Sequence, residues 1–233
     1  MVSHALDTGD YVPVGRYPFE LRLAAPGDLD EIYELIDEAA AWLRDKGTDQ
    51  WERPWPSREA RHRRVLSGLE NGETWIVWDG SDPVATITTA TQPNPKVWSN
   101  LSPECDLSER AVYVHRLIAA RRYAGSELGS ELIDWAGLHG HCLYGAQWIR
   151  VDVWSSNLAL HDYYLARGFL PCGRCADPYY PSGALFQKPV LAIRPPSLPP
   201  VHRDLVPLTS PAVRSMAHAF DRPEHSVQDR RST

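Results

Sequence analysis

The chain contains a strand–loop–helix segment whose composition suits the binding of an anion. AVYVHRLIA (111–119) reads as a central strand, and Gly125 and Gly129 then lead into a helix that extends to about His141. The free N–H groups and the dipole of a helix N-terminus attract phosphate, and glycine allows phosphate to approach closely. The glycine spacing matches neither GxGxxG nor GxxxxGK[ST]. The segment therefore indicates anion binding without naming the ligand.

A tyrosine near the end of a later helix is a candidate proton donor. The segment NLALHDYYLARGF (157–169) forms a helix that Gly168 ends, followed by Phe169 at the start of a strand. Tyr164 lies one turn before the end of this helix, and a phenol in that place can donate a proton to a reacting group. Packing of Tyr164 against the core is the alternative.

The four cysteines indicate neither a metal site nor a disulfide framework. Cys172 and Cys175 form one CxxC pair, but a structural zinc site needs a second pair. A thioredoxin-like pair would lie at a helix start, whereas this pair lies in a predicted strand. We expect buried or half-buried thiols and no bound metal.

The elements that must position these residues alternate between strands and helices. We predict an α/β (α+β) fold, a mixed twisted sheet of about six or seven strands with helices on both faces. We expect an irregular leader (1–18), one domain (19–191) and a Pro-rich C-terminal extension (192–233). The expected strands are 19–24, 74–80, 83–90, 111–119, 148–154, 169–175 and 183–190, and the expected helices are 28–46, 57–72, 125–141 and 157–167.

Composition excludes several classes of protein. The 233 residues are 43% hydrophobic and carry a net charge of −6, which is ordinary for a globular domain and disfavours a dedicated nucleic-acid binder. No run of 18 apolar residues exists and the N-terminus lacks the apolar region of a secretory signal, so we expect a cytoplasmic protein without a membrane partner. Arginine outnumbers lysine 21 to 3, a composition compatible with specialised metabolism.

The element order and two motifs resemble the GNAT N-acetyltransferase superfamily. On the loop that follows the central strand, Arg122 and Gly125 match the family pattern RGxGxG, while Tyr123 and Glu127 stand where glycines are expected. Asn157, Tyr164, Gly168 and Phe169 match the later motif in order and spacing. The resemblance covers about residues 19–190 and implies a splayed central pair of parallel strands, 111–119 and 148–154.

The resemblance implies an acyl transferase that uses acetyl-CoA or another acyl thioester as co-substrate and a small-molecule amine as acceptor. Tyr164 would protonate the departing thiolate. The loop between the first two helices would border the acceptor. The donor-binding residues would be Leu117, Ile118, Ala119, Arg122, Ala124, Gly125, Ser126, Glu127, Leu128, Gly129, Ser130 and Asn157, and the acceptor-binding residues Trp51, Trp55 and Tyr113.

The family's usual glutamate base is absent, because Tyr113 occupies its place in the strand. His115 is the nearest replacement, since histidine titrates near neutral pH. Strand alternation predicts Tyr113, His115 and Leu117 on one face. Alternatively, His115 is a packed strand residue and a water molecule or Asp152 relays the proton.

Glu127 is the sharpest departure from the family pattern. A carboxylate in the first helical turn would satisfy the helix dipole itself and compete with a phosphate. At about 7 Å and a dielectric of about 40, each charge pair repels by about 1 kcal/mol. Two phosphate charges would then lower the affinity for coenzyme A roughly 50-fold. Alternatively, the side chain turns to solvent and coenzyme A binds.

These departures leave other functions open. The donor could be an acyl carrier protein or an aminoacyl-tRNA, which the basic stretch 44–64 could receive. The chain could also be a ligand-binding module that keeps the fold without the chemistry. Formation of a homodimer is left open.

Overall fold

One eight-stranded sheet forms the centre of the protein, in a computed structural model that describes residues 10–14, 17–52 and 54–193. The strand order is β1-β2-β3-β4-β5-β6-β8-β7. The strands are β1 (Asp10–Val14), β2 (Tyr17–Leu23), β3 (Thr74–Asp79), β4 (Asp82–Ala90), β5 (Ala111–Ala119), β6 (Trp148–Val153), β7 (Leu170–Arg174) and β8 (Ala184–Pro189). The α-helices are α1 (Leu29–Asp45), α2 (Arg58–Glu70), α3 (Leu128–Tyr144) and α4 (Leu158–Ala166), and the 3₁₀ helices are η1 (Pro26–Asp28), η2 (Arg121–Tyr123) and η3 (Val190–Ala192).

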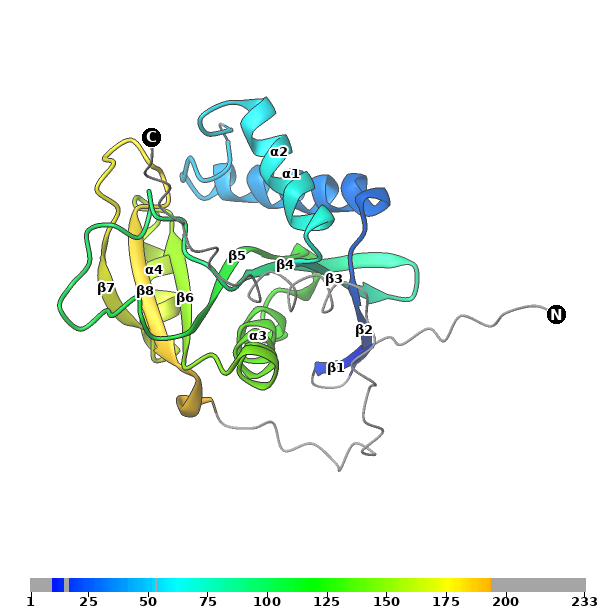
Figure 1. The fold of residues 1–233 in the computed structure, drawn as a ribbon. Helices are drawn as coiled ribbons and strands as arrows, with labels where there is room; N and C mark the ends of the chain where they lie inside the picture. Colours follow the sequence, from blue (N-terminus) through cyan, green and yellow to red (C-terminus); the bar gives the residue numbers. More distant parts are fainter. Residues whose placement is uncertain (1–9, 15–16, 53, 194–233) are drawn as a thin grey trace, which may run out of the picture. The chain divides into compact units, whose positions relative to one another are not determined.

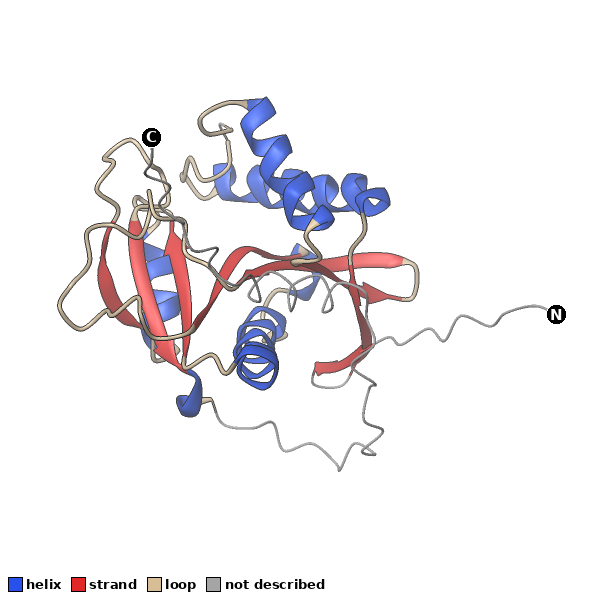
Figure 2. Cartoon of the chain, viewed as in Figure 1, coloured by secondary structure: helices blue, strands red, loops and turns tan. Residues whose placement is uncertain are grey.

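Helices cover both faces of the sheet, as predicted (Figures 1 and 2). Helices α1 and α2 bury an apolar stripe that includes Ile32, Ile36 and Val65 against β3 and the end of β5. On the other face, Leu132 and Ala136 of α3 and Tyr164 of α4 share a second cluster with the strands. No described helix is both long and apolar enough to cross a bilayer.

The predicted splay of the central strands is confirmed. Strands β5 and β6 are parallel and pair from Ala111–Trp148 to Val114–Val151. Beyond Val114, β5 pairs only with β4, while β6 continues against β8. The crossover through α3 supplies the connection that parallel pairing requires. One edge of residues 115–119 is therefore left without a strand partner, and the gap that opens there contains the candidate site.

A β-bulge in β5 causes this divergence. The register between β4 and β5 shifts by one residue between Thr86 and Thr88, and Arg116 adopts a left-handed conformation with φ of 47°. An extra residue bends a strand and moves the following side chains to the opposite face. Val114 and Leu117 consequently both pack on the α3 side, so the expectation that Leu117 shares a face with His115 is wrong.

The N-terminal segment contains a strand that sequence analysis did not predict. Residues 10–14 form β1 at the edge of the sheet, within the leader expected to be irregular, and Pro13 pairs opposite Pro18 of β2. Proline occurs in edge strands because it lacks an N–H to donate. The predicted C-terminal extension lies outside the described residues, except for residues 192 and 193.

The cysteine arrangement also differs from expectation. Cys172 of β7 forms a disulfide with Cys105, 67 residues away, while Cys175 and Cys142 are free. The bond attaches the long loop 91–110 to the edge of the sheet. CxxC spacing gave no sign of it because the partner is remote in the sequence.

Candidate active site

A cavity of about 920 Å³ follows the gap between β5 and β6. Its walls include the acid candidate Tyr164, the base candidate His115, and both tryptophans expected at the acceptor, Trp51 and Trp55. The predicted donor-binding residues that line it are Leu117, Ile118, Ala119, Ala124, Gly125, Glu127, Leu128, Gly129, Ser130 and Asn157. Arg122, Ser126 and Tyr113 do not line it: Arg122 pairs with Asp82 at 3.5 Å, and the Ser126 hydroxyl donates to the Tyr123 carbonyl.

His115 faces a carboxylate across the gap between the strands. Its Nδ1 lies 2.9 Å from Oδ1 of Asp152 on β6, within ion-pair distance, although Oδ1 has no well-aligned hydrogen bond. The other oxygen of Asp152 accepts a 2.7 Å hydrogen bond from Tyr180. Burial, with the neighbouring Asp152, raises the pKa of Tyr180 far above its ordinary range, so this phenol stays a donor. Asp152 can thus orient the imidazole and leave Nε2 as the free nitrogen.

Tyr164 is 7% exposed and presents its ring to the core. The ring contacts Phe169 edge-on and stacks against Phe186. Within the described chain its hydroxyl has no hydrogen-bond partner, yet the residue lines the cavity. Burial raises the pKa of Tyr164 far above its ordinary range, and the nearby Asp152 acts in the same direction. The phenol therefore remains protonated and available to a ligand.

Tyr113 does not reach the cavity, contrary to its predicted contact with the acceptor. It is 2% exposed and packs against Trp98 at a ring separation of 5.2 Å. Its hydroxyl accepts a 3.0 Å hydrogen bond from the buried guanidinium of Arg150. Loop 91–110, which contains Trp98, covers this part of β5, so Tyr113 belongs to the core.

Loop 48–57 is attached to both sides of the gap. Asp49 accepts hydrogen bonds from the Trp154 indole (2.8 Å) and the Ser156 hydroxyl (3.0 Å) at the end of β6. Arg61 of α2 donates to the Trp51 carbonyl at 2.7 Å. Trp55 contacts the ring of Tyr180 edge-on at 5.0 Å. The two tryptophans are therefore held in the cavity wall; their contact with an acceptor stays a prediction.

Asn157 uses its side chain within the protein. Its Oδ1 accepts from the Leu160 N–H at 3.1 Å and caps α4, while Nδ2 donates to Gln50 at 2.7 Å. The side chain thus joins α4 to loop 48–57. These two hydrogen bonds explain why the motif has an asparagine here, without the expected contact with the donor.

Replacing Asn157 with alanine should lower the free energy of unfolding by about 1–2 kcal/mol, because an N-cap is lost together with a partly buried hydrogen bond. Urea denaturation followed by circular dichroism measures the change. Gln50→Ala is the matched control, since it removes the loop contact and retains the cap. Equal stability of Asn157→Ala and wild type would contradict this role.

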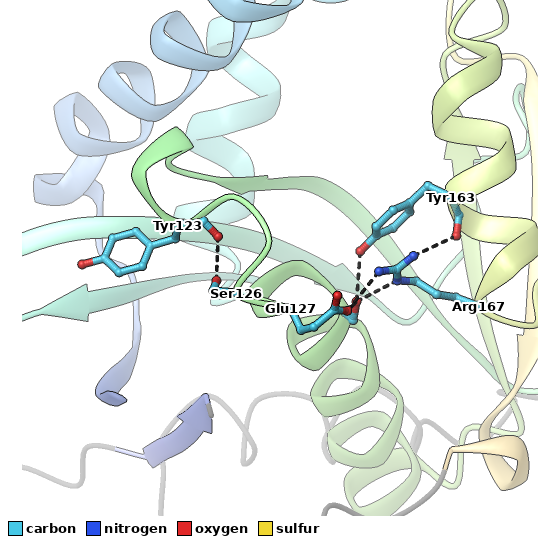
Figure 3. A network of polar contacts seen from close by, with 6 residues as sticks. Tyr123, Ser126, Glu127, Tyr163 and Arg167 are labelled. Carbon is cyan, nitrogen blue, oxygen red and sulfur yellow. Dashed lines mark hydrogen bonds and ion pairs between the residues drawn. The ribbon is translucent and has the colours of Figure 1, made fainter. Parts of the chain in front are cut away.

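Glu127 does not cap α3, which corrects the expectation that it satisfies the helix dipole. It is the N-cap residue by position, with φ of 63°, but its side chain makes no capping hydrogen bond. Its carboxylate instead accepts from Ser130 at 2.8 Å and pairs with Arg167 of α4 at 3.0 Å (Figure 3). These contacts, that of Ser130 first, lower the pKa of Glu127. The Glu127 side chain is 63% exposed, as the alternative of a side chain turned to solvent expects, and its pairing with Arg167 leaves the helix N-terminus open.

The start of α3 retains the features of an anion site. The N–H groups of Leu128, Gly129 and Ser130 have no acceptor within the described chain. Tyr163, whose ring lies under the Arg167 guanidinium at 3.6 Å, brings its hydroxyl close to Gly129 and Ser130 (Figure 3). Three free N–H groups at a helix N-terminus suit a phosphate.

Comparison with known families agrees with this geometry. Residues 32–169, more than half of the chain, match the Acetyltransferase (GNAT) family. The chain belongs to this family. An uncharacterised N-acetyltransferase, YesJ of Bacillus subtilis, is 28% identical over 165 residues, which are 71% of this chain and 87% of YesJ.

Solved structures share the GNAT fold. An acetyltransferase of the family from Listeria monocytogenes aligns with a TM-score of 0.61 and 24% identity, over 77% of this chain and 99% of that one. An N-acetyltransferase from Thermoplasma acidophilum, solved in complex with coenzyme A, aligns with a TM-score of 0.50 and 15% identity, over 73% of this chain and 98% of that one.

The structure adds residues to this GNAT site that sequence reasoning did not assign. Arg167 neutralises Glu127, Tyr180 bonds Asp152, and Arg116 lines the cavity beside His115. The sequence could have pointed to Arg116 as a site residue, because it is an arginine inside an apolar strand. No local pattern marks Tyr180, which lies in a loop. Within the described ranges no group of three or more His, Cys, Asp or Glu side chains could hold a metal ion.

Proposed function

We propose that this GNAT protein transfers an acyl group, acetyl by default, from coenzyme A to the amine of a small molecule. The observation that carries the proposal is the contact of His115 and Asp152 across the gap between β5 and β6, in the cavity that Tyr164 also lines. This places a base and a proton donor at one opening. A ligand-binding module without chemistry would have no need of that pair.

Two features support coenzyme A as the donor. The unpaired edge of residues 115–119 can bond an extended pantetheine as an added strand would. The free N–H groups at the start of α3 can bind the pyrophosphate. The protein of this fold from Thermoplasma acidophilum was solved with coenzyme A.

His115 would take the proton of the attacking amine. An ammonium group has no lone pair, so attack on the thioester needs a base. Asp152 faces Nδ1 of His115 and would stabilise the imidazolium as the proton arrives at Nε2. The bond between nitrogen and the carbonyl carbon then forms, and the negative charge on the carbonyl oxygen requires a donor such as a backbone N–H of β5 near Leu117.

Tyr164 would act on the departing sulfur. When the carbon–sulfur bond breaks, negative charge develops on the thiolate, and the phenol can donate a hydrogen bond to it. Because burial raises the pKa of Tyr164, full proton transfer to sulfur is less favourable than this hydrogen bond. The proton received by His115 can later neutralise the thiolate.

The ion pair of Glu127 weakens the case for another donor. An unpaired Glu127 would repel the pyrophosphate and so favour a carrier protein or an aminoacyl-tRNA as donor, but Arg167 offsets that charge. Arg61 and Arg64 of the basic stretch donate to carbonyls of loop 48–57. Both arginines therefore hold this loop in place, whether or not they also contact RNA.

Transfer itself is tested by incubating the full chain with acetyl-CoA and a panel of primary amines, amino acids, aminoglycosides and polyamines. Released thiol reports turnover and mass spectrometry identifies the acetylated product. We expect amine-dependent thiol release. Binding of coenzyme A without transfer to any amine would favour the ligand-binding module.

The ion pair also gives a prediction for donor affinity. Arg167→Met should weaken binding of coenzyme A roughly 10- to 50-fold, because Glu127 is then left uncompensated near the phosphates, at about 1 kcal/mol for each charge pair. The double variant Glu127→Gln/Arg167→Met should recover most of the loss, and Glu127→Gln alone should stay within about threefold of wild type. Calorimetry with coenzyme A measures all four proteins. A double variant as weak as Arg167→Met would contradict the compensation.

A further inference from the structure

Arg116 is a cation in the cavity wall that pairs directly with no described carboxylate. It follows His115 in β5, and the bulge directs both polar side chains into the same cavity. Its Nη2 donates to the Thr88 hydroxyl at 3.2 Å. Within the described chain it forms no ion pair with a carboxylate.

The surroundings of Arg116 raise the cost of its charge. Burial, and after it the neighbouring Arg64, lowers the pKa of Arg116 to about 10, against the attraction of Asp152 and Glu73. Since this value is well above neutrality, the guanidinium stays charged. A half-buried cation without a directly paired anion is unfavourable, and the left-handed backbone of Arg116 adds strain. Both features of Arg116 are unfavourable for folding, so we expect this residue to have a function that compensates for them.

Arg150 shows how this fold satisfies a buried arginine that has a structural role. Its guanidinium is fully buried and donates to four acceptors: Gln187, Tyr113 and the carbonyls of Asp106 and Glu109. Arg116 has one acceptor, a neutral hydroxyl. The remaining donors of Arg116 are therefore available to a ligand in the cavity.

The site also provides room at the guanidinium. Gly68 of α2 faces it, and a Cβ at that position would lie 2.7 Å from the Thr74 hydroxyl and 3.0 Å from Nη2 of Arg116. A glycine inside a helix is unfavourable by about 1 kcal/mol relative to alanine. At this position the missing side chain leaves room for both the Thr74 hydroxyl and the arginine.

We propose that the acceptor carries a carboxylate close to its amine, as an amino acid does, and that Arg116 binds this carboxylate. The inference rests on the proposed transferase function and names its substrate class. Guanidinium and carboxylate form paired hydrogen bonds with matched geometry. Because the bulge directs His115 and Arg116 into the same cavity, a ligand bound to both presents its amine to the base and its carboxylate to the cation.

The test compares amino acids with their carboxamides, their decarboxylated amines and the matching aminophosphonates as acceptors with acetyl-CoA. We expect wild type to acetylate carboxylates preferentially. Arg116→Met should lower kcat/KM for carboxylates roughly 30- to 1,000-fold, mostly through KM, and change the carboxamides less than about threefold. Arg116→Lys should retain part of the activity, and Arg58→Met, an exposed arginine of α2 outside this cavity, should match wild type.

Thermal unfolding separates this role from a structural one. Arg116→Met removes a charge that has no direct ion-pair partner and should melt at the same temperature as wild type or higher. A preference for carboxamides, decarboxylated amines or phosphonates would overturn the inference, as would an equal loss for all acceptors in Arg116→Met. Failure to acetylate any amine would instead overturn the transferase function and the inference with it.

Discussion

Replacing His115 with glutamine should lower kcat about 100- to 10,000-fold, the usual contribution of a positioned base. Glutamine keeps a polar side chain of similar length but cannot accept the proton of the amine. The pH dependence of kcat should also differ between wild type and His115→Gln. Asp152→Asn should also lower kcat, because the amide cannot stabilise an imidazolium.

His62→Gln provides the matched control, since His62 is exposed on α2 and does not line the cavity. It should retain the wild-type rate and pH profile. Steady-state kinetics from pH 5.5 to 9 compares the proteins, and calorimetry shows whether the variants still bind coenzyme A. A His115→Gln protein with the wild-type rate and pH dependence would leave proton removal to water.

Replacing Tyr164 with phenylalanine should lower kcat about 100- to 1,000-fold with little change in affinity for coenzyme A. The hydroxyl makes no hydrogen bond within the described chain, so its removal leaves no buried partner unsatisfied and stability should hold. The lost interaction forms only as charge develops on sulfur, comparable to the loss of an oxyanion donor.

The control for this variant is Tyr179→Phe, because Tyr179 is 83% exposed and its side chain does not line the cavity. Donors with better leaving groups provide a sharper test. An acetyl thioester of an aromatic thiol stabilises its own thiolate, so Tyr164→Phe should lose less activity with it than with acetyl-CoA. An equal loss with both donors would contradict stabilisation of the departing sulfur.

Local patterns predicted the elements that carry the site. The apolar strand at 111–119, the glycines before α3 and the motif from Asn157 to Phe169 each depend on residues close in sequence. Their positions, the parallel pairing and the splay followed from these patterns and the family resemblance. Strand β1 escaped prediction because Pro13 is a weak strand signal and only pairing with β2 reveals the strand.

The contacts that decide the chemistry depend on residues remote in sequence. Alternation in β5 predicted the face of Leu117 wrongly, since one bulged residue reverses the pattern. Glu127 was placed on the helix dipole because Arg167, 40 residues later, is absent from any local window. The contact of Asp152 with His115 and the disulfide of Cys105 also join residues that are remote in sequence.

We expect the thioester and the amine to meet in the gap between β5 and β6. A crystal structure of the full chain with bound coenzyme A tests this expectation. The pyrophosphate should lie on the N–H groups of Leu128 to Ser130, the pantetheine along the free edge of β5, and the sulfur within hydrogen-bond distance of the Tyr164 hydroxyl. Coenzyme A bound outside this gap, or with its sulfur remote from both Tyr164 and His115, would contradict it.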